Sequence, residues 1–123
     1  MSDKPYDAVI VGAGFSGMAI AIALQKKGLE NFLILEQAEE VGGTWRENTY
    51  PGAECDIASA LYSYSFEQNA SWNFKWSEQA QIHAYQTGVA KKYGLYEKTK
   101  FGINVSAAEY DESNALWRVE TQQ

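Results

Sequence analysis

The sequence Asp7-Ala8-Val9-Ile10-Val11-Gly12-Ala13-Gly14-Phe15-Ser16-Gly17 decides the fold of this chain. Its β-branched run at residues 9–11 has no polar side, which predicts a strand buried on both faces. Three glycines follow at the spacing G-x-G-x-x-G. In that spacing the first glycine permits a tight turn and the second lets the backbone approach a pyrophosphate. The third allows a helix to pack closely on the strand.

The next residues complete a strand–turn–helix–strand unit. Residues 15–27 are apolar almost all round, as in a helix buried against a sheet, and Gly28 is the expected left-handed stop. A right-handed crossover then leads to a parallel strand at residues 32–35. Glu36 ends this strand 19 residues after Gly17, where an acid can accept a hydrogen bond from a ribose hydroxyl. The phosphates of a dinucleotide would lie at the helix N-terminus, where the macrodipole favours negative charge.

Two questions stay open from these residues alone. A glycine-rich turn in an ordinary α/β unit is the alternative to a nucleotide site, although the motif has the strand, helix and terminal acid that a nucleotide site requires. The acid at Glu36 suits both NAD and FAD, whereas an NADP site would more often offer an arginine there.

Composition limits the partners and the compartment. The 123 residues carry a net charge of −6, which argues against nucleic acid and anionic membrane surfaces. Cys55 is the only cysteine and His83 the only histidine, so we expect no intramolecular disulfide, no metal site and a cytoplasmic protein. Residues 8–24 are largely apolar, but acidic residues precede them and glycines interrupt them, so we expect neither a signal peptide nor a membrane span. Residues 1–6 form a loose polar leader.

The remaining chain is less regular. Residues 37–56 show neither helical nor strand periodicity, which indicates a functional loop, and Gly42-Gly43 can bring backbone amides against an anion or a flat ring. Alternating aromatics at residues 57–66 predict a short strand or extended edge. Ser77 can cap a helix that ends at Gly94. Residues 99–110 and 116–120 read as strands of a hairpin joined at residues 111–114.

These pieces together resemble a known family. Glu36, the run Gly42-Gly43-Thr44-Trp45, the run Tyr50-Pro51-Gly52, Cys55-Asp56 and the aromatic run 62–66 occur in the order found in class B flavoprotein monooxygenases. The similarity is greatest to the Baeyer–Villiger type. It implies an α/β fold: a Rossmann-like βαβ FAD-binding unit with an appended helix and β-hairpin, incomplete relative to the family. The family cofactors are FAD and NADPH.

The resemblance also implies roles for individual residues. The FAD pyrophosphate would lie against Gly12, Gly14, Phe15, Ser16 and Gly17, and Glu36 would hold the adenosine ribose. Gly43, Thr44 and Trp45 would line the cofactor beyond the pyrophosphate. Asp56 would lie at the flavin ring with Ile57 beside it and Tyr62 in the same region, and Val105 would meet the adenine with its backbone. Asp56 is the one catalytic candidate, because it could tune the charge of an arginine from a second nucleotide domain.

In the implied reaction, NADPH reduces the flavin and one oxygen atom of dioxygen is inserted into a ketone or heteroatom substrate. We expect residues 1–123 to be the N-terminal portion of the FAD-binding domain, with the NADPH-binding and C-terminal parts absent, because no second glycine fingerprint occurs. The alternative is a truncated, non-catalytic nucleotide-binding module that requires a partner chain with the missing domains. A disulfide reductase would usually need a cysteine pair, and a plain NAD dehydrogenase leaves residues 42–62 unexplained.

Overall fold

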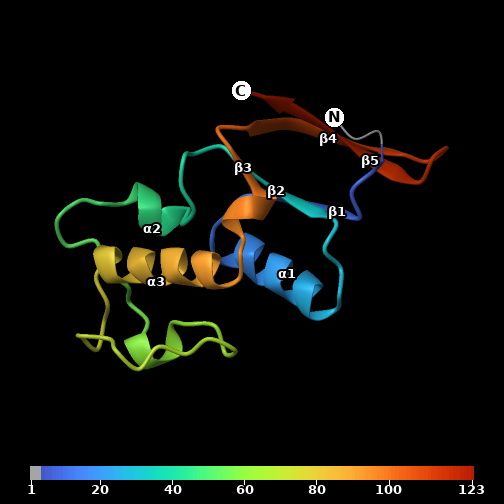
Figure 1. The fold of residues 1–123 in the computed structure, drawn as a ribbon. Helices are drawn as coiled ribbons and strands as arrows, with labels where there is room; N and C mark the ends of the chain where they lie inside the picture. The colour runs from blue at the N-terminus through green and yellow to red at the C-terminus, as the bar shows by residue number, and fades with distance from the viewer. Residues whose placement is uncertain (1–3) are drawn as a thin grey trace.

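The computed structural model describes residues 4–123 (Figure 1), so the first three residues of the predicted polar leader lie outside the described part. The elements in chain order are β1 (Ala8–Val11), α1 (Phe15–Lys26), β2 (Phe32–Glu36), α2 (Thr44–Glu47), η1 (Ser59–Leu61), α3 (Gln79–Lys92), η2 (Tyr96–Lys98), β3 (Thr99–Phe101), β4 (Asn104–Asp111) and β5 (Leu116–Gln122).

The opening βαβ unit forms as its sequence predicts. β1 pairs with β2 in parallel, with Ala8 opposite Phe32 and Val11 opposite Leu35, and α1 makes the crossover between them. Helix α1 ends where Gly28 adopts a φ of +80°, a conformation that residues with a Cβ rarely adopt. The α/β fold class is therefore confirmed.

The sheet has a third strand, β3, which the sequence analysis did not predict as a separate strand. The run expected as one strand over residues 99–110 is divided at Gly102, which has a φ of +69°. Before this break, β3 pairs with β2 in parallel, giving the order β1-β2-β3. After it, β4 pairs with β5 in the antiparallel hairpin that the sequence predicts.

The core lies between the sheet and two helices. Figure 1 shows α1 and α3 on one side of the three-stranded sheet and the β4–β5 hairpin on the other. The side chains of Met18 and Ile22 from α1, Ile34 from β2 and Val89 from α3 meet in one buried cluster. Burying such side chains contributes about 1.5–3 kcal/mol each relative to leaving them exposed, so this cluster fixes both helices against the sheet.

Strand β1 is not buried on both faces, which corrects the prediction from its apolar run. Ile10 faces the core, but Val9 is 36% exposed and Val11 63% exposed. Because side chains alternate along a strand, Val9 and Val11 face the side of the sheet opposite the helices, where the hairpin in Figure 1 leaves them partly uncovered.

Two further predictions are wrong. Residues 57–66 form the short helix η1 and turns rather than a strand. Ser77 does not cap α3, which begins after Glu78 without a side-chain cap. Instead the Ser77 hydroxyl is buried 2.5 Å from the Ser59 hydroxyl, whose own proton is donated to the Phe74 carbonyl at 2.7 Å. Ser77 therefore donates to Ser59, and the pair ties together the two ends of the irregular segment between η1 and α3.

Two glycines in helices should respond in opposite ways to alanine. A Cβ on Gly17 would lie 2.0 Å from the Gly12 carbonyl oxygen, whereas a Cβ on Gly88 would meet nothing within 4 Å. We expect Gly17→Ala to destabilise the fold by about 3 kcal/mol through overpacking. Gly88→Ala should stabilise it by roughly 0.5–1 kcal/mol through helix propensity. Urea unfolding followed by circular dichroism measures both, and a Gly17→Ala protein as stable as the wild type would contradict the packing.

Candidate functional site

The glycine fingerprint forms a tight turn between β1 and α1. Gly12 has a φ of +97° and donates its N–H to the Leu35 carbonyl at 2.8 Å. The close approach of Gly17 to the Gly12 carbonyl lets α1 begin directly after the strand. The turn thus uses its first and third glycines as the spacing predicts.

The start of α1 offers unpaired backbone donors. The first N–H groups of a helix have no intrahelical acceptor, and the cap residue Gly14 has no side chain to supply one. Within residues 4–123, no acceptor pairs with the amides of Phe15, Ser16 or Gly17. These donors lie at the positive end of the 12-residue helix, where an anion is stabilised.

A second glycine loop packs against the first. Gly42 and Gly43 both have positive φ, at +128° and +56°. The Gly42 N–H donates to the Ala13 carbonyl at 2.9 Å, and a Cβ on Gly14 would lie 3.9 Å from the Gly43 Cα. The backbones of the two loops therefore approach each other with no side chain between them.

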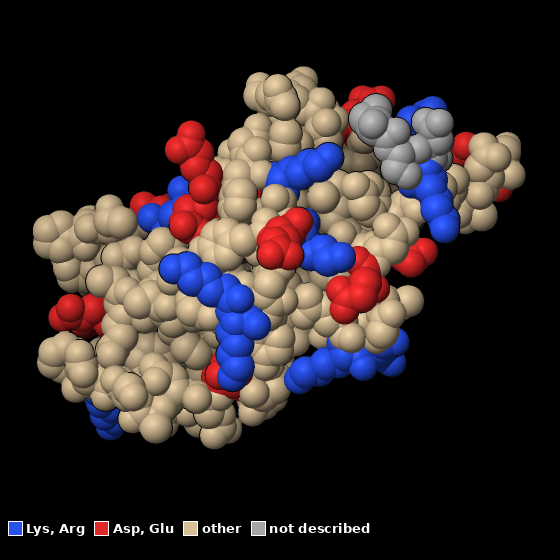
Figure 2. All heavy atoms as spheres, in the orientation of Figure 1, with Lys and Arg blue, Asp and Glu red and all other residues tan. Residues whose placement is uncertain are grey.

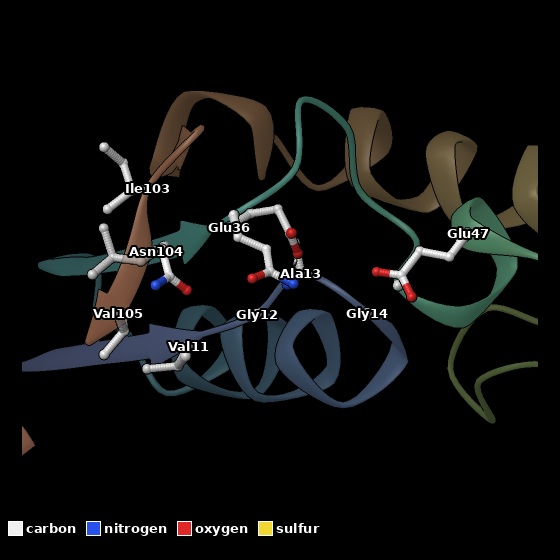
Figure 3. Close-up of a pocket in the computed structure, with 12 residues that line it drawn as sticks. Val11, Gly12, Ala13, Gly14, Glu36, Glu47, Ile103, Asn104 and Val105 are labelled. Atoms are coloured by element: carbon white, nitrogen blue, oxygen red, sulfur yellow. Dashed lines mark hydrogen bonds between the residues drawn. The ribbon is translucent and has the colours of Figure 1, made fainter. Parts of the chain in front are cut away.

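Two cavities adjoin these loops. The first, here called the Glu36 cavity, has a volume of about 280 Å³ (Figure 3). It is lined by Val11, Gly12, Ala13, Gly14, Leu35, Glu36, Gln37, Gly43, Glu47, Ile103, Asn104 and Val105. The second, here called the Tyr62 cavity, has a volume of about 430 Å³. It is lined by Val11, Gly12, Gly14, Phe15, Ser16, Gly17, Gly42, Gly43, Thr44, Trp45 and Tyr62.

The two cavities share part of their lining, so they lie next to each other at the glycine turn and are here together called the cleft. The residues common to both are Val11, Gly12, Gly14 and Gly43. The start of the hairpin borders one end of the cleft, and α2 with Tyr62 borders the other. An elongated ligand with an anionic group matches this arrangement, because Gly43, one of the residues with an unpaired amide, lines both cavities and the start of α1 lines the Tyr62 cavity.

Glu36 is buried and already hydrogen-bonded. Its side chain is 5% exposed, and its two carboxylate oxygens accept from the Ala13 amide at 2.9 Å and the Ala38 amide at 2.8 Å. Each carboxylate oxygen can accept a second hydrogen bond, so the group retains capacity for a ligand hydroxyl. Figure 3 shows a second carboxylate, that of Glu47, directed toward the same turn, and it pairs with Arg46 at 2.7 Å.

Aromatic side chains build the other end of the cleft. The Trp45 indole donates to the Tyr62 hydroxyl at 2.9 Å, and the Phe15 ring meets Tyr62 edge to face. The Tyr64 hydroxyl donates to the Phe15 carbonyl. Burial, with a smaller contribution from the neighbouring Tyr85, raises the pKa of Tyr64 well above its ordinary value. Tyr64 therefore keeps the proton that fixes the backbone at the start of α1.

Most of the predicted site residues gather at this cleft. Only Asp56 and Ile57 lie outside the lining of both cavities. Asp56 is exposed in a bend, and the Ile57 amide donates to the Cys55 sulfur at 3.3 Å. Sequence reasoning missed Ile103 and Asn104, which follow the Gly102 break, and it gave His83 no role. Gly102 was the sequence signal that could have identified Ile103 and Asn104, because a glycine inside a strand pattern indicates a change of direction.

Other features of the described residues concern metals, membranes and charge. Residues 4–123 contain no group of three or more His, Cys, Asp or Glu side chains able to hold a metal ion, and none of their helices is long and apolar enough to cross a membrane. Cys55 is free and buried, as expected for a small core residue. On the face drawn in Figure 2, acidic and basic side chains are interspersed.

The fold and the glycine cleft agree with a family match. The family described as an NAD(P)-binding Rossmann-like domain matches residues 10–76, from the first strand through the irregular segment. The chain belongs to this family. The matched residues contain both glycine loops and Glu36.

Longer relatives extend the similarity to monooxygenases. The FAD-binding monooxygenase ktnD of Aspergillus niger is 46% identical over 112 residues, which are 90% of this chain and 18% of the relative. A Baeyer–Villiger monooxygenase of Pseudomonas aeruginosa is 43% identical over 114 residues, which are 93% of this chain and 22% of that protein. The structure of an oxidised steroid monooxygenase bound to NADP matches with a TM-score of 0.89 and 39% identity, over 94% of this chain and 23% of that one.

These matches confirm the resemblance to Baeyer–Villiger type monooxygenases. FAD and NADP appear in the names of the relatives, in agreement with the two cofactors expected for the family. The chain spans about a fifth of the length of the curated relatives described here.

The Glu36 carboxylate stabilises the fold through its two hydrogen bonds from backbone amides. Glu36→Gln keeps the size of the side chain but turns an NH₂ group toward one of the two backbone amides that now donate to it. We expect the free energy of unfolding to fall by about 1–3 kcal/mol, because a buried donor loses its acceptor. Glu47→Gln is the matched control: its carboxylate is 52% exposed and should change stability by less than about 1 kcal/mol. Equal urea midpoints for Glu36→Gln and the wild type would show that the two hydrogen bonds contribute nothing.

Proposed function

We propose that this chain is the FAD-binding segment of a flavin-dependent, NADPH-using monooxygenase of the Baeyer–Villiger type. The observation that carries the proposal is the pair of adjoining cavities at the two glycine loops, with unpaired backbone amides in their lining. The monooxygenase relatives, one of them named as FAD-binding, support the choice of FAD over NAD.

In this proposal the ends of the cleft take the two ends of FAD. The Glu36 carboxylate accepts from the adenosine ribose, and the backbone at Val105 meets the adenine. The amides at the start of α1 and at Gly43 and Thr44 bind the pyrophosphate. Trp45 and Tyr62 then border the flavin half, since their indole–hydroxyl hydrogen bond fixes both rings at that end.

Bound FAD would supply the redox chemistry, with NADPH as the reductant, dioxygen as the oxygen source, and a ketone or heteroatom compound as the substrate. The residues described here would bind and orient the cofactor. Asp56 and Ile57 are proposed to lie at the flavin ring, and Asp56 is exposed and therefore accessible to an arginine from another domain. A cytoplasmic location belongs to the same proposal, because the buried free thiol of Cys55 does not require an oxidising compartment.

Catalysis requires further polypeptide in this proposal. The relatives are several times longer than this chain, and within residues 4–123 β1 is an edge strand with the apolar side chain of Val9 exposed. A strand pairing along that edge would satisfy its backbone groups, and a layer over the face would cover Val9. The remaining domains could belong to the same polypeptide or, in the alternative form of the proposal, to a partner chain for which this one is a nucleotide-binding module.

FAD titration tests the binding assignment. We expect the wild-type chain to quench flavin fluorescence with weak affinity. In Gly14→Val, we expect affinity to fall at least about tenfold, which is 1.4 kcal/mol, because the side chain would occupy the place of the pyrophosphate. Gly14 has a φ of −86°, and a Cβ there would meet the Gly43 Cα at an ordinary contact distance of 3.9 Å, so the fold should tolerate the change. Gly88→Ala, far along α3, is the control and should bind FAD like the wild type. Equal affinities for Gly14→Val and the wild type would refute the phosphate cradle.

A second measurement concerns activity. We expect the isolated chain to show no oxygen-dependent NADPH consumption in the presence of FAD, because no second glycine fingerprint for NADPH occurs in residues 1–123. Absorbance at 340 nm with and without dioxygen measures this. Turnover above the rate of free FAD would show that residues 1–123 suffice for the redox step.

A further inference from the structure

A stripe of polar side chains on α3 faces the second glycine loop. Gln79, His83 and Gln86 are spaced four and three residues apart, which places them on one face of the helix. Figure 1 shows α2, which follows this loop, beside the N-terminal half of α3. The stripe therefore lies behind the segment that borders the cleft.

Each side chain of the stripe donates to a backbone carbonyl of residues 41–45. The His83 Nε2 atom lies 2.9 Å from the Val41 oxygen, and since a carbonyl only accepts, Nε2 must carry the proton. The Gln86 amide donates to the Gly42 carbonyl at 3.2 Å. The Gln79 amide donates to the Trp45 carbonyl.

These contacts fix the direction of the peptide groups in the loop. In a trans peptide the C=O and the following N–H point in opposite directions, and no peptide bond of the described chain is cis. The 41–42 peptide is held at both ends, by His83 on its oxygen and by the Ala13 carbonyl on its N–H. The 42–43 peptide has its oxygen turned toward Gln86, so the Gly43 N–H points away from α3.

The Gly43 N–H remains without a hydrogen-bond acceptor in this arrangement of the described residues. No acceptor within residues 4–123 pairs with it or with the Thr44 N–H, and Gly43 lines both cavities. His83 also restricts the loop sterically, because a Cβ on Gly42 would lie 2.7 Å from its ring. The helix thus donates to the loop carbonyls, the Gly42 carbonyl also accepting the Trp45 N–H at 3.2 Å, while the Gly43 and Thr44 amides stay without an acceptor among residues 4–123.

The burial of the Gln86 side chain is energetically unfavourable at one of its two polar atoms. Its side chain is fully buried, and its Oε1 has no partner among the described residues. An unpaired buried acceptor is unfavourable by about 1–3 kcal/mol, which an apolar side chain of the same size would avoid. The bond from its Nε2 to the Gly42 carbonyl is the interaction that offsets this cost.

We propose that His83 and Gln86 are positioning residues for the pyrophosphate subsite: they hold the Val41 and Gly42 carbonyls so that the Gly43 and Thr44 amides face the anion. This inference rests on the proposed dinucleotide function. Neither side chain lines either cavity, so they act through the loop and not by contact with the ligand.

The test compares FAD affinity with stability in the full 123-residue chain. His83→Leu removes the donor, and His83→Gln restores an amide N–H near the position of Nε2. Gln86→Met removes both the donor and the unpaired oxygen at similar volume. Gln81→Leu is the matched control, because Gln81 lies on the same helix but bonds Ser71 and Asn73 in a different loop. Fluorescence titration gives the FAD dissociation constant, and thermal unfolding gives Tm.

We expect His83→Leu and Gln86→Met each to weaken FAD binding about three- to tenfold, the size of one misplaced hydrogen bond. The FAD dissociation constants of His83→Gln and Gln81→Leu should stay within about twofold of the wild-type value. Gln86→Met should keep or raise Tm while it weakens binding, which a purely structural role would not produce.

Wild-type affinity in Gln86→Met together with His83→Leu would overturn the inference and leave the proposed function intact. The same conclusion follows if Gln81→Leu weakens binding as much as these variants. If His83→Leu does not fold, Gln86→Met decides alone. Absence of FAD binding by the wild-type chain would overturn the proposed function and this inference together.

Discussion

The peptide units on either side of Ala13 are the constraint on which the cleft depends. The Ala13 N–H donates to the Glu36 carboxylate, and its carbonyl accepts the Gly42 N–H. Residues from the first turn, the end of β2 and the second glycine loop are thus joined at one place. Because a buried backbone group without a partner is costly by about 1–3 kcal/mol, the two loops cannot separate without losing these bonds. The distance between their amides, and so the shape of the anion subsite, follows from this constraint.

The same acid explains why the hairpin begins at the cleft. Besides its carboxylate contacts, Glu36 accepts the Ile103 N–H on its backbone carbonyl at 3.0 Å, and the Gly102 N–H donates to Ala38 at 2.9 Å. The chain therefore changes direction at Gly102 against the end of β2, which brings Asn104 and Val105 to the cavity. An acid at the end of a second strand is commonly interpreted as a ligand acceptor. Here it also organises three backbone segments before any ligand arrives.

The sequence predicts this molecule well where the signal is local. The left-handed conformations of Gly12 and Gly28, helix α1 and the β4–β5 hairpin all follow from nearby residues. Prediction from the sequence fails where a residue distant along the chain determines which contact forms. Ser77 has the right position for a cap, but its hydroxyl bonds Ser59. The alternating aromatics after η1 pack on Phe15 and each other instead of pairing as a strand. The short strand β3 exists only because β2 lies beside it.

The exposure of β1 has two separate physical causes. An all-apolar run predicts a strand covered on both faces, yet both Val9 and Val11 are exposed. Val11 lines both cavities, so its exposure is into the cleft, where a bound cofactor would cover it. Val9 lines neither cavity, and burying it would take a layer over that face of the sheet. In the proposed function, this one apolar run therefore meets two neighbours: the cofactor at its carboxyl end and further polypeptide over its face.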